Sequence, residues 1–290
     1  MKSSLIKLHL AVFLWGFTGV LGRLISLNEG LLVWYRMLIT IITLFLLMWK
    51  QGALQKLPKK TVLQLFGIGG IVALHWVFFY GAIKISNISI TLICLSSSGL
   101  ITAVLEPFIV GSKFSIREVA LSLMGIVGIY LIFHFDTKFQ KGIIVGMIAT
   151  FLSVAFSVLN KRLIHNVPSK SIMLYELTGG WLILTLFMPL YLKLFPSISL
   201  FPTSLDWGWL MILSWVCTVL AMDLSLQALR HMSVFTQNLT LNLEPVYGII
   251  LAFIVFKENK NLNASFYIGF GLIALSVAFQ MIRVLHYKKH

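Results

Sequence analysis

Polar side chains crowd into one short stretch of an otherwise apolar sequence, NLTLNLEP at residues 238–245. Asn238, Thr240, Asn242 and Glu244 fall within seven positions there, and a proline follows the acid. An ionisable group in the hydrocarbon of a membrane is costly and usually faces a bundle interior or a water-filled cavity. Glu244 could bind and release a proton, bind the ammonium group of a substrate, or have a purely structural role.

Helical geometry groups these polar residues. At 100° per residue, Gln237, Thr240 and Glu244 share one face, and Asn238 and Asn242 lie beside it. The amides either contact a substrate or cement helix packing through hydrogen bonds. The proline after Glu244 has no backbone N–H, so a carbonyl one turn earlier loses its helical partner and could bind a cation or a water. Proton-coupled antiport is one mechanism that a carboxyl group in this setting would suit.

Other apolar stretches supply further candidates for the same cavity. His75 either lines the cavity or makes a neutral interhelical hydrogen bond, and Trp76 and Tyr80 beside it either line the cavity or pack. Asp223 and Gln227 are four residues apart and therefore share a helix face. The predicted substrate-binding residues are His75, Trp76, Tyr80, Ser97, Asp223, Gln227, Asn238, Asn242 and Glu244.

Three more charged residues are candidates for gating or coupling: Arg36, Glu106 and Glu176. Arg36 could instead anchor a helix end at the membrane surface. Glu176 could instead be stabilised by the positive N-terminal end of its helix dipole. Arg36 and Glu176 are expected near opposite faces of the membrane and are not expected to pair.

The acids are too scattered for a recognisable catalytic or metal centre. A membrane-embedded transferase needs a close histidine–acid pair or clustered acids, yet His75 has no Asp or Glu within seven residues on either side. Cys94 and Cys217 lie in apolar runs and suggest no metal site. No catalytic residue, metal or cofactor is therefore predicted. A membrane-embedded enzyme or a sensor without transport is the alternative to a transporter.

The composition places the chain in a membrane. Of its 290 residues 59% are apolar, the mean hydropathy is +0.94, and only 11% are charged, whereas about a quarter of a soluble domain is charged. The net charge of +14 does not indicate nucleic-acid binding, because the basic residues lie between apolar runs. The N-terminal run continues to about Ile25 without a small-residue cleavage site, which predicts a spanning helix and not a signal peptide.

Ten apolar stretches are long enough to span a bilayer, which takes about 20 residues. Fifteen Lys and Arg residues fall on one side of this arrangement and eight on the other. Because positive charge is enriched in cytoplasmic loops, both termini are predicted to be cytoplasmic, in the inner (cytoplasmic) cell membrane. The stretches are roughly 5–26, 31–49, 62–83, 88–110, 119–135, 142–160, 172–192, 207–228, 234–256 and 264–284.

The two halves of the sequence resemble each other. YGAIKISNISI at 80–90 is similar to LQALRHMSVFT at 226–236, and GIVGIYLIF at 125–133 to GLIALSVAF at 271–279, both at an offset of 146. The chain is therefore predicted to hold two five-helix repeats. Because each repeat has an odd number of helices, the two repeats must lie in opposite orientations in the membrane. This is the inverted-repeat architecture of many transporters. The predicted boundaries are 1–137 for the first repeat and 138–290 for the second.

The two Glu-Pro pairs of the sequence are not counterparts. At the offset of 146, Glu244 matches Ser98, and Glu106 matches Ala252. The mid-membrane counterparts are therefore SSSG in the first half and NLEP in the second. Both segments are polar, and both weaken their helix through glycine or proline. They are predicted to approach one central cavity.

The order and spacing of several segments resemble the EamA-type transporters of the drug/metabolite transporter superfamily, over nearly the whole chain. LWGFTG at 14–19, YRM with Arg36, FFYGAIKIS at 78–86 and LSLQALRHMS at 224–233 are similar to family segments, and NLEPVYGIILAFIVFKE at 242–258 is the most similar. The resemblance implies ten helices in two inverted repeats. It also implies export or exchange of small metabolites, amino acids among them.

The sequence thus predicts an all-α membrane protein with ten transmembrane helices as two inverted five-helix repeats. Its predicted function is that of a secondary transporter, an exporter or exchanger of small metabolites such as amino acids. The predicted partners are a small-molecule substrate and the lipid bilayer, with the protein a monomer or a weak homodimer.

Overall fold

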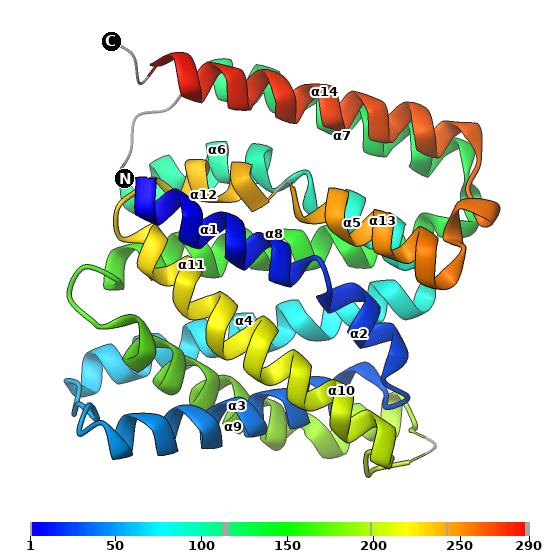
Figure 1. The fold of residues 1–290 in the computed structure, drawn as a ribbon. Coiled ribbons are helices and arrows are strands. Elements are labelled where there is room, and N and C mark those ends of the chain that lie inside the picture. The colour runs from blue at the N-terminus through cyan, green and yellow to red at the C-terminus, as the bar shows by residue number, and fades with distance from the viewer. Residues whose placement is uncertain (1, 112–115, 198, 242, 288–290) are drawn as a thin grey trace.

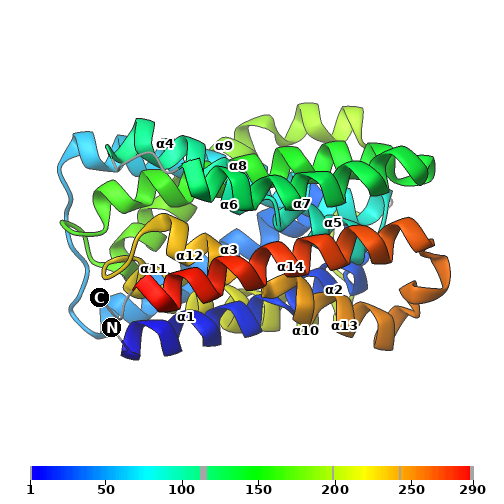
Figure 2. The ribbon, with the colours of Figure 1, turned by 90° about the horizontal axis from the view of Figure 1, so that it is seen from above.

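The computed structural model is a bundle of helices that run roughly along one common direction (Figure 1; Figure 2). It describes residues 2–111, 116–197, 199–241 and 243–287. Throughout these ranges the regular structure is helical, with two 3₁₀ segments and one π-helical segment. The predicted all-α fold is therefore confirmed.

The helices fall where the apolar stretches of the sequence predict them. In chain order the elements are α1 (Lys2–Trp15), α2 (Thr18–Leu24), α3 (Glu29–Lys50), α4 (Lys59–Ile85), α5 (Ile88–Leu95), α6 (Ser98–Val110), α7 (Ile116–Phe135), η1 (Thr137–Phe139), α8 (Gln140–Leu163), α9 (Ser169–Leu194), α10 (Ser204–Ser214), η2 (Trp215–Leu220), α11 (Ala221–Leu229), α12 (Val234–Leu241), α13 (Glu244–Phe256), η3 (Glu258–Asn261) and α14 (Ala264–Tyr287).

Seven helical rods in the described ranges are long and apolar enough to cross a membrane. α13 and the part of α14 from Ala264 to Leu275 are shorter apolar helices. The seven rods are Ser3–Leu24, Glu29–Lys50, Lys59–Ile85, Ile88–Val110, Thr137–Leu163, Ser169–Leu194 and Ser204–Leu229.

Large apolar side chains also cover the outside of the bundle. Phe108 is 79% exposed, Leu186 76% and Leu63 74%. Soluble monomers rarely expose wide apolar surfaces, whereas lipid chains solvate such side chains without cost. The outer surface therefore suits hydrocarbon, and the polar groups are turned inward.

Two central interruptions lie at matching positions of the two halves. α5 ends at Leu95 and α12 at Leu241, while α6 begins at Ser98 and α13 at Glu244. Both pairs are separated by 146 residues, the offset found in the sequence. In the first half the Ser97 hydroxyl bonds back to the Cys94 carbonyl at 2.7 Å, and in the second half a proline follows Glu244 and supplies no N–H.

Packing between the halves follows the same duplication. α4 packs along α8 and α9 of the second half, and its counterpart rod, α10 to α11, packs along α3 and α1 of the first half. α5 lies against α13 and α6 against α12, and α7 pairs with α14 at one edge of the bundle (Figure 1). Each half therefore completes the packing of the other, so a site between them is built from both.

The crossing of α4 and α9 depends on two glycines. A Cβ atom added to Gly69 would overlap the carbonyl oxygen of Glu176, and one added to Gly180 would overlap the carbonyl oxygen of Gly69. Backbone cannot yield as a flexible side chain does. These positions therefore set how closely the two halves approach at this crossing.

We predict that Gly69→Ala destabilises the protein by about 1–3 kcal/mol, the usual cost of overpacking. Gly67→Ala, two residues away on the same helix, is the matched control because a Cβ added there meets open space. The thermal unfolding midpoint of the purified protein in detergent measures the difference. Equal midpoints for the two variants would contradict the close crossing.

Candidate functional site

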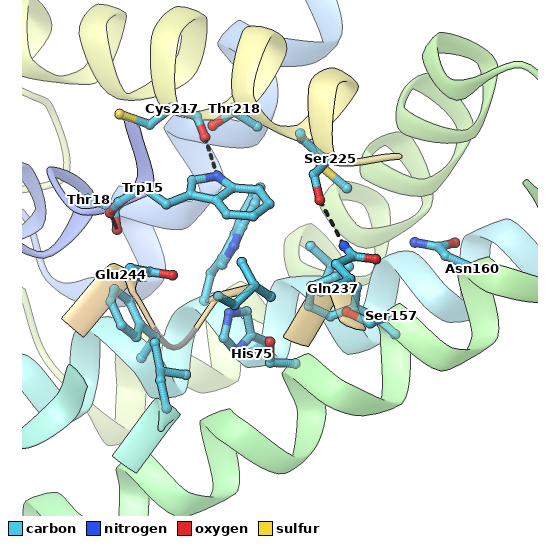
Figure 3. A pocket seen from close by; sticks show the side chains of 18 of the residues that line it. Trp15, Thr18, His75, Ser157, Asn160, Cys217, Thr218, Ser225, Gln237 and Glu244 are labelled. Atoms are coloured by element: carbon cyan, nitrogen blue, oxygen red, sulfur yellow. Dashed lines mark hydrogen bonds between the residues drawn. The ribbon is translucent and has the colours of Figure 1, made fainter. Parts of the chain in front are cut away.

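A cavity of about 100 Å³ lies between the two halves (Figure 3). It is large enough for several water molecules or a small ligand. Both helix interruptions contribute to its wall, through Leu95 and Ser98 in the first half and Leu241 and Glu244 in the second. The other polar or amphipathic lining residues are Trp15, Thr18, Arg36, His75, Trp76, Ser153, Ser157, Asn160, Cys217, Thr218, Ser225 and Gln237.

Arg36 is the positive charge of the cavity. It lies two turns into α3, is 2% exposed, and its guanidinium carbon sits 3.8 Å from the ring centroid of Trp76. Its Nε donates to the Thr218 hydroxyl at 2.9 Å and its Nη1 to the Tyr80 hydroxyl at 2.7 Å. A guanidinium carries five N–H groups, and no carboxylate of the described residues lies within 4 Å of it. Arg36 is therefore not a helix-end anchor, and it retains donors for an anion.

Glu244 is the acidic group of the same cavity. It is the first residue of α13, is 9% exposed, and its side chain lies near Thr18 and Trp15 (Figure 3). Within the described part of the chain no hydrogen-bond donor reaches its carboxylate, and Trp15 instead donates its indole N–H to the Cys217 carbonyl at 2.9 Å. Arg36 and Glu244 thus line one cavity without forming an ion pair with each other.

Amide groups occupy the side of the cavity away from Glu244 (Figure 3). Gln237 donates to the Ser225 hydroxyl at 2.8 Å, and Asn160 donates to both carboxylate oxygens of Glu176 at 3.2 and 3.3 Å. The remaining amide oxygens, Oε1 of Gln237 and Oδ1 of Asn160, have no partner among the described residues. Buried acceptors are seldom left unsatisfied, so these two are available to a ligand or a water.

His75 combines the two roles that its position allowed. Its Nδ1 lies 2.8 Å from the carbonyl oxygen of Ala149, and its ring lies near Phe79 and Phe156 in the cavity wall. A carbonyl only accepts hydrogen bonds, so Nδ1 carries a proton. His75 is therefore both an interhelical hydrogen-bond donor and a lining residue.

Comparison with known proteins agrees with this architecture. The model of the EamA-like transporter family matches residues 2–134 and, a second time, residues 140–281. The chain belongs to the EamA-like transporter family. The resemblance found in the sequence is thereby confirmed. The protein is a multi-pass membrane protein. Its family transports small molecules, and the members of the family are generally not enzymes.

A solved structure described only as a crystal structure of a protein shares the fold. It is similar with a TM-score of 0.69 and 17% sequence identity, and the alignment covers 96% of each chain. At that identity the likeness concerns the fold alone. No curated protein matches the sequence.

Several of the predicted substrate-binding residues lie outside the cavity wall. Tyr80 is fully buried behind Arg36, and Ser97 bonds to a backbone carbonyl and to the Met147 sulfur. Asn238 points away and donates to the Thr102 hydroxyl at 2.7 Å. Of the predicted binding residues, His75, Trp76 and Glu244 line the cavity, and Asn242 lies outside the described residues.

Asp223 and Gln227 belong to a separate polar chain. Lys7 of α1 donates to Gln227 at 2.7 Å, Gln227 donates to Asp223 at 2.9 Å, and Ser169 at the start of α9 also donates to Asp223. This chain joins both halves of the protein at one end of the bundle. Neither Asp223 nor Gln227 lines the cavity.

The predicted gating residues separate in the same way. Arg36 lines the cavity, Glu176 is fully buried behind Asn160, and Glu106 lies at an end of the bundle against α12. Sequence reasoning missed Asn160 and the serines of α8. A signal existed, because Ser153, Ser157 and Asn160 recur at helical spacing and share one face.

We predict that Arg36→Gln abolishes the stabilisation of the protein by carboxylate-bearing ligands, because the cavity then lacks its cation. Arg36→Lys is expected to keep part of it, since an ammonium group lacks the bidentate fork. The shift of the unfolding midpoint with a panel of amino acids, monocarboxylates and amines measures the effect. Lys50→Gln on the exposed surface is the control, and a full ligand shift in Arg36→Gln would exclude Arg36 from binding.

Proposed function

We propose that this EamA-like protein is a secondary transporter, an exporter or exchanger, of small metabolites that carry both a carboxylate and an ammonium group, such as amino acids. The observation that carries the proposal is that two ionisable groups in one cavity, the Arg36 guanidinium and the Glu244 carboxyl, have no ionic partner among the described residues. Arg36 has no carboxylate partner and Glu244 no donor partner among the described residues. A zwitterion placed between them satisfies both.

The chemistry of the cavity wall supports this class of substrate. A carboxylate binds a guanidinium through two parallel hydrogen bonds, and an ammonium group is a compact donor that suits the Glu244 carboxylate. Val72, Phe79 and Phe156 supply apolar surface for a side chain. The cavity of about 100 Å³ restricts the substrate to small molecules.

We infer that the chain crosses the membrane ten times as two inverted repeats, residues 1–137 and 138–290. The matching interruptions support this, and so do two basic residues 146 positions apart. Lys84 donates to the carbonyl of Leu27, just after α2, and Arg230 donates to the carbonyl of Ile164, just after α8, at 3.0 Å. Each therefore fastens the segment that follows the first rod of its own half.

Inverted repeats give a simple route for alternating access, because the two halves can exchange conformations around a central site. Counterflow of labelled amino acids into liposomes containing the purified protein tests transport directly. Accumulation of label is expected for a transporter. A membrane-embedded enzyme or a sensor would give none, and that result would refute the proposed function.

Glu244→Gln distinguishes the roles of the acid, because glutamine keeps the shape and cannot ionise. If Glu244 carries the coupling proton, uphill pH-driven transport is lost while substrate exchange survives. If Glu244 binds the ammonium group of the substrate, the binding free energy becomes less favourable by about 2–5 kcal/mol. Transport driven by a pH gradient and ligand affinity are the two measurements, and Glu244→Asp is the charge-conserving control. Normal values of both in a folded Glu244→Gln protein exclude both roles.

We propose that both termini are cytoplasmic. The start of α1 and the end of α14 lie at the same end of the bundle (Figure 1), which supports placing both termini on one side, and the excess of Lys and Arg predicted on that side supports its being the cytoplasmic one. Ser3 and Ser199 are exposed. Asn28 donates to the carbonyl of Phe195, which joins the segment before Ser199 to the end of the bundle opposite Ser3.

We predict that single cysteines at Ser3 and Ser199, in a protein lacking Cys94 and Cys217, react with an impermeant thiol reagent from opposite sides of the membrane. The Ser3 cysteine should react from the cytoplasmic side, and reagent added after detergent permeabilisation controls for reactivity. Labelling of both from the same side would exclude this topology.

A further inference from the structure

Two buried glutamates make the same contact at opposite ends of the bundle. Glu106 near the end of α6 accepts the backbone N–H groups of Val234 at 3.2 Å and Phe235 at 2.9 Å. These are the first two residues of α12. The Glu106 side chain therefore caps α12, a helix of the other half.

Glu258 just beyond α13 makes the reciprocal contact. Its two oxygens accept the backbone N–H groups of Ile88 at 3.1 Å and Ser89 at 3.0 Å, the first two residues of α5. The Ser89 hydroxyl adds a third hydrogen bond at 2.7 Å. Glu258 thus caps a helix of the first half.

The capped groups are repeat counterparts. Ile88 and Val234 are separated by the repeat offset of 146, as are Ser89 and Phe235. The acids themselves are 152 positions apart, so the sequence alignment paired Glu106 with Ala252 and hid its structural counterpart. The two caps are consequently one device used twice, in opposite directions.

Each carboxylate can hold its capped helix firmly and can also be released from it. The first N–H groups of a helix have no intrahelical partner, and within a membrane an unsatisfied backbone group costs several kcal/mol. Glu106 and Glu258 are 6% and 2% exposed. Arg23 forms an ion pair with Glu258, and Lys161 interacts electrostatically with Glu106. A cation therefore lies beside each cap, and it can interact with the carboxylate when the capped helix moves away.

We propose that the two caps are the alternating gates of the transporter. Each cap releases the helix that it holds, α12 or α5, when the cavity opens at that end of the bundle. The proposal rests on the transport function proposed above. The capped helices carry cavity residues, Leu95 on α5 and Gln237 and Leu241 on α12, so tilting either helix widens the cavity toward its capped end. Both caps are formed in this structure, so the rods α5–α6 and α12–α13 are held together at both ends of the bundle.

A native cysteine provides the reporter. Cys217 lines the cavity and is 1% exposed, whereas Cys94 is fully buried and does not line it. In a Cys94→Ala background, reaction of Cys217 with a small membrane-impermeant thiol reagent reports access to the cavity from the side on which the reagent is added. Cys217→Ser supplies the background signal.

The experiment compares sidedness for the two caps. Glu106→Gln is expected to raise the rate of Cys217 labelling roughly tenfold, the factor that loss of one charge-assisted hydrogen bond corresponds to, from the Glu106 end alone. Glu258→Gln is expected to do so from the opposite end alone. Unchanged rates, or equal increases from both ends in either variant, would overturn the proposal.

Proline variants test the same hydrogen bonds from the donor side and keep both acids. Val234→Pro and Ile88→Pro each remove one capped N–H at a position where a helix tolerates proline, and Val234→Ala and Ile88→Ala lose the side chain but keep the N–H. The proline variants should reproduce the sided increase and the alanine variants should not. Loss of folded protein in both glutamine and both proline variants would also overturn the proposal, because a cap that the fold always requires cannot open.

Failure of the transport function is recognised separately. Counterflow with the unmodified protein reports transport, and Cys217 labelling requires no substrate. Sided labelling without counterflow would leave a gated cavity in a protein that does not transport. Counterflow without sided labelling would overturn the gates alone.

Discussion

The need to satisfy backbone polar groups inside hydrocarbon is the constraint on which the rest of this structure depends. Continuous helices meet that need by themselves, yet the rods α1–α2, α5–α6 and α12–α13 are interrupted. An interruption leaves helix-end groups without intrahelical partners, and it is tolerable where it faces a cavity or a polar side chain. The cavity lies at the interruptions of α5–α6 and α12–α13 for this reason, and the outer ends of α5 and α12 are capped by carboxylates.

Charged residues within the rods divide by what they contact. Lys84 and Arg230 donate to carbonyl oxygens in segments that follow helices, and Arg23 pairs with Glu258. These side chains hold the scaffold. Arg36 differs, because neutral hydroxyls and the Trp76 ring orient its guanidinium and no anion neutralises it among the described residues. A buried charge held in this way favours the binding of an anionic group, which is the physical basis of the proposed substrate class.

The scaffold is duplicated and the site is not. Counterparts such as Ile88 and Val234 keep the same contact in both halves, since backbone N–H groups need a partner whatever the side chain is. At the helix interruptions the counterparts differ, with Ser98 in the first half and Glu244 in the second. A symmetric pair of halves can alternate between equivalent conformations, while an asymmetric cavity can bind a substrate whose two ends carry opposite charges.

The sequence by itself determined the helices, the repeat offset and the family, because each depends on local composition or on similarity along the chain. It also indicated that Gln237 and Glu244 share a face, and both line the cavity. Only the tertiary structure separated Gln237 from Asn238, moved Tyr80 behind Arg36, joined Asp223 to Lys7 through Gln227, and matched Glu106 with Glu258. In a membrane the lipid-facing and packed sides of a helix are both apolar, so hydrophobic periodicity says little about which side faces the cavity. That choice is made by contacts with helices of the other half, more than a hundred residues away in the sequence.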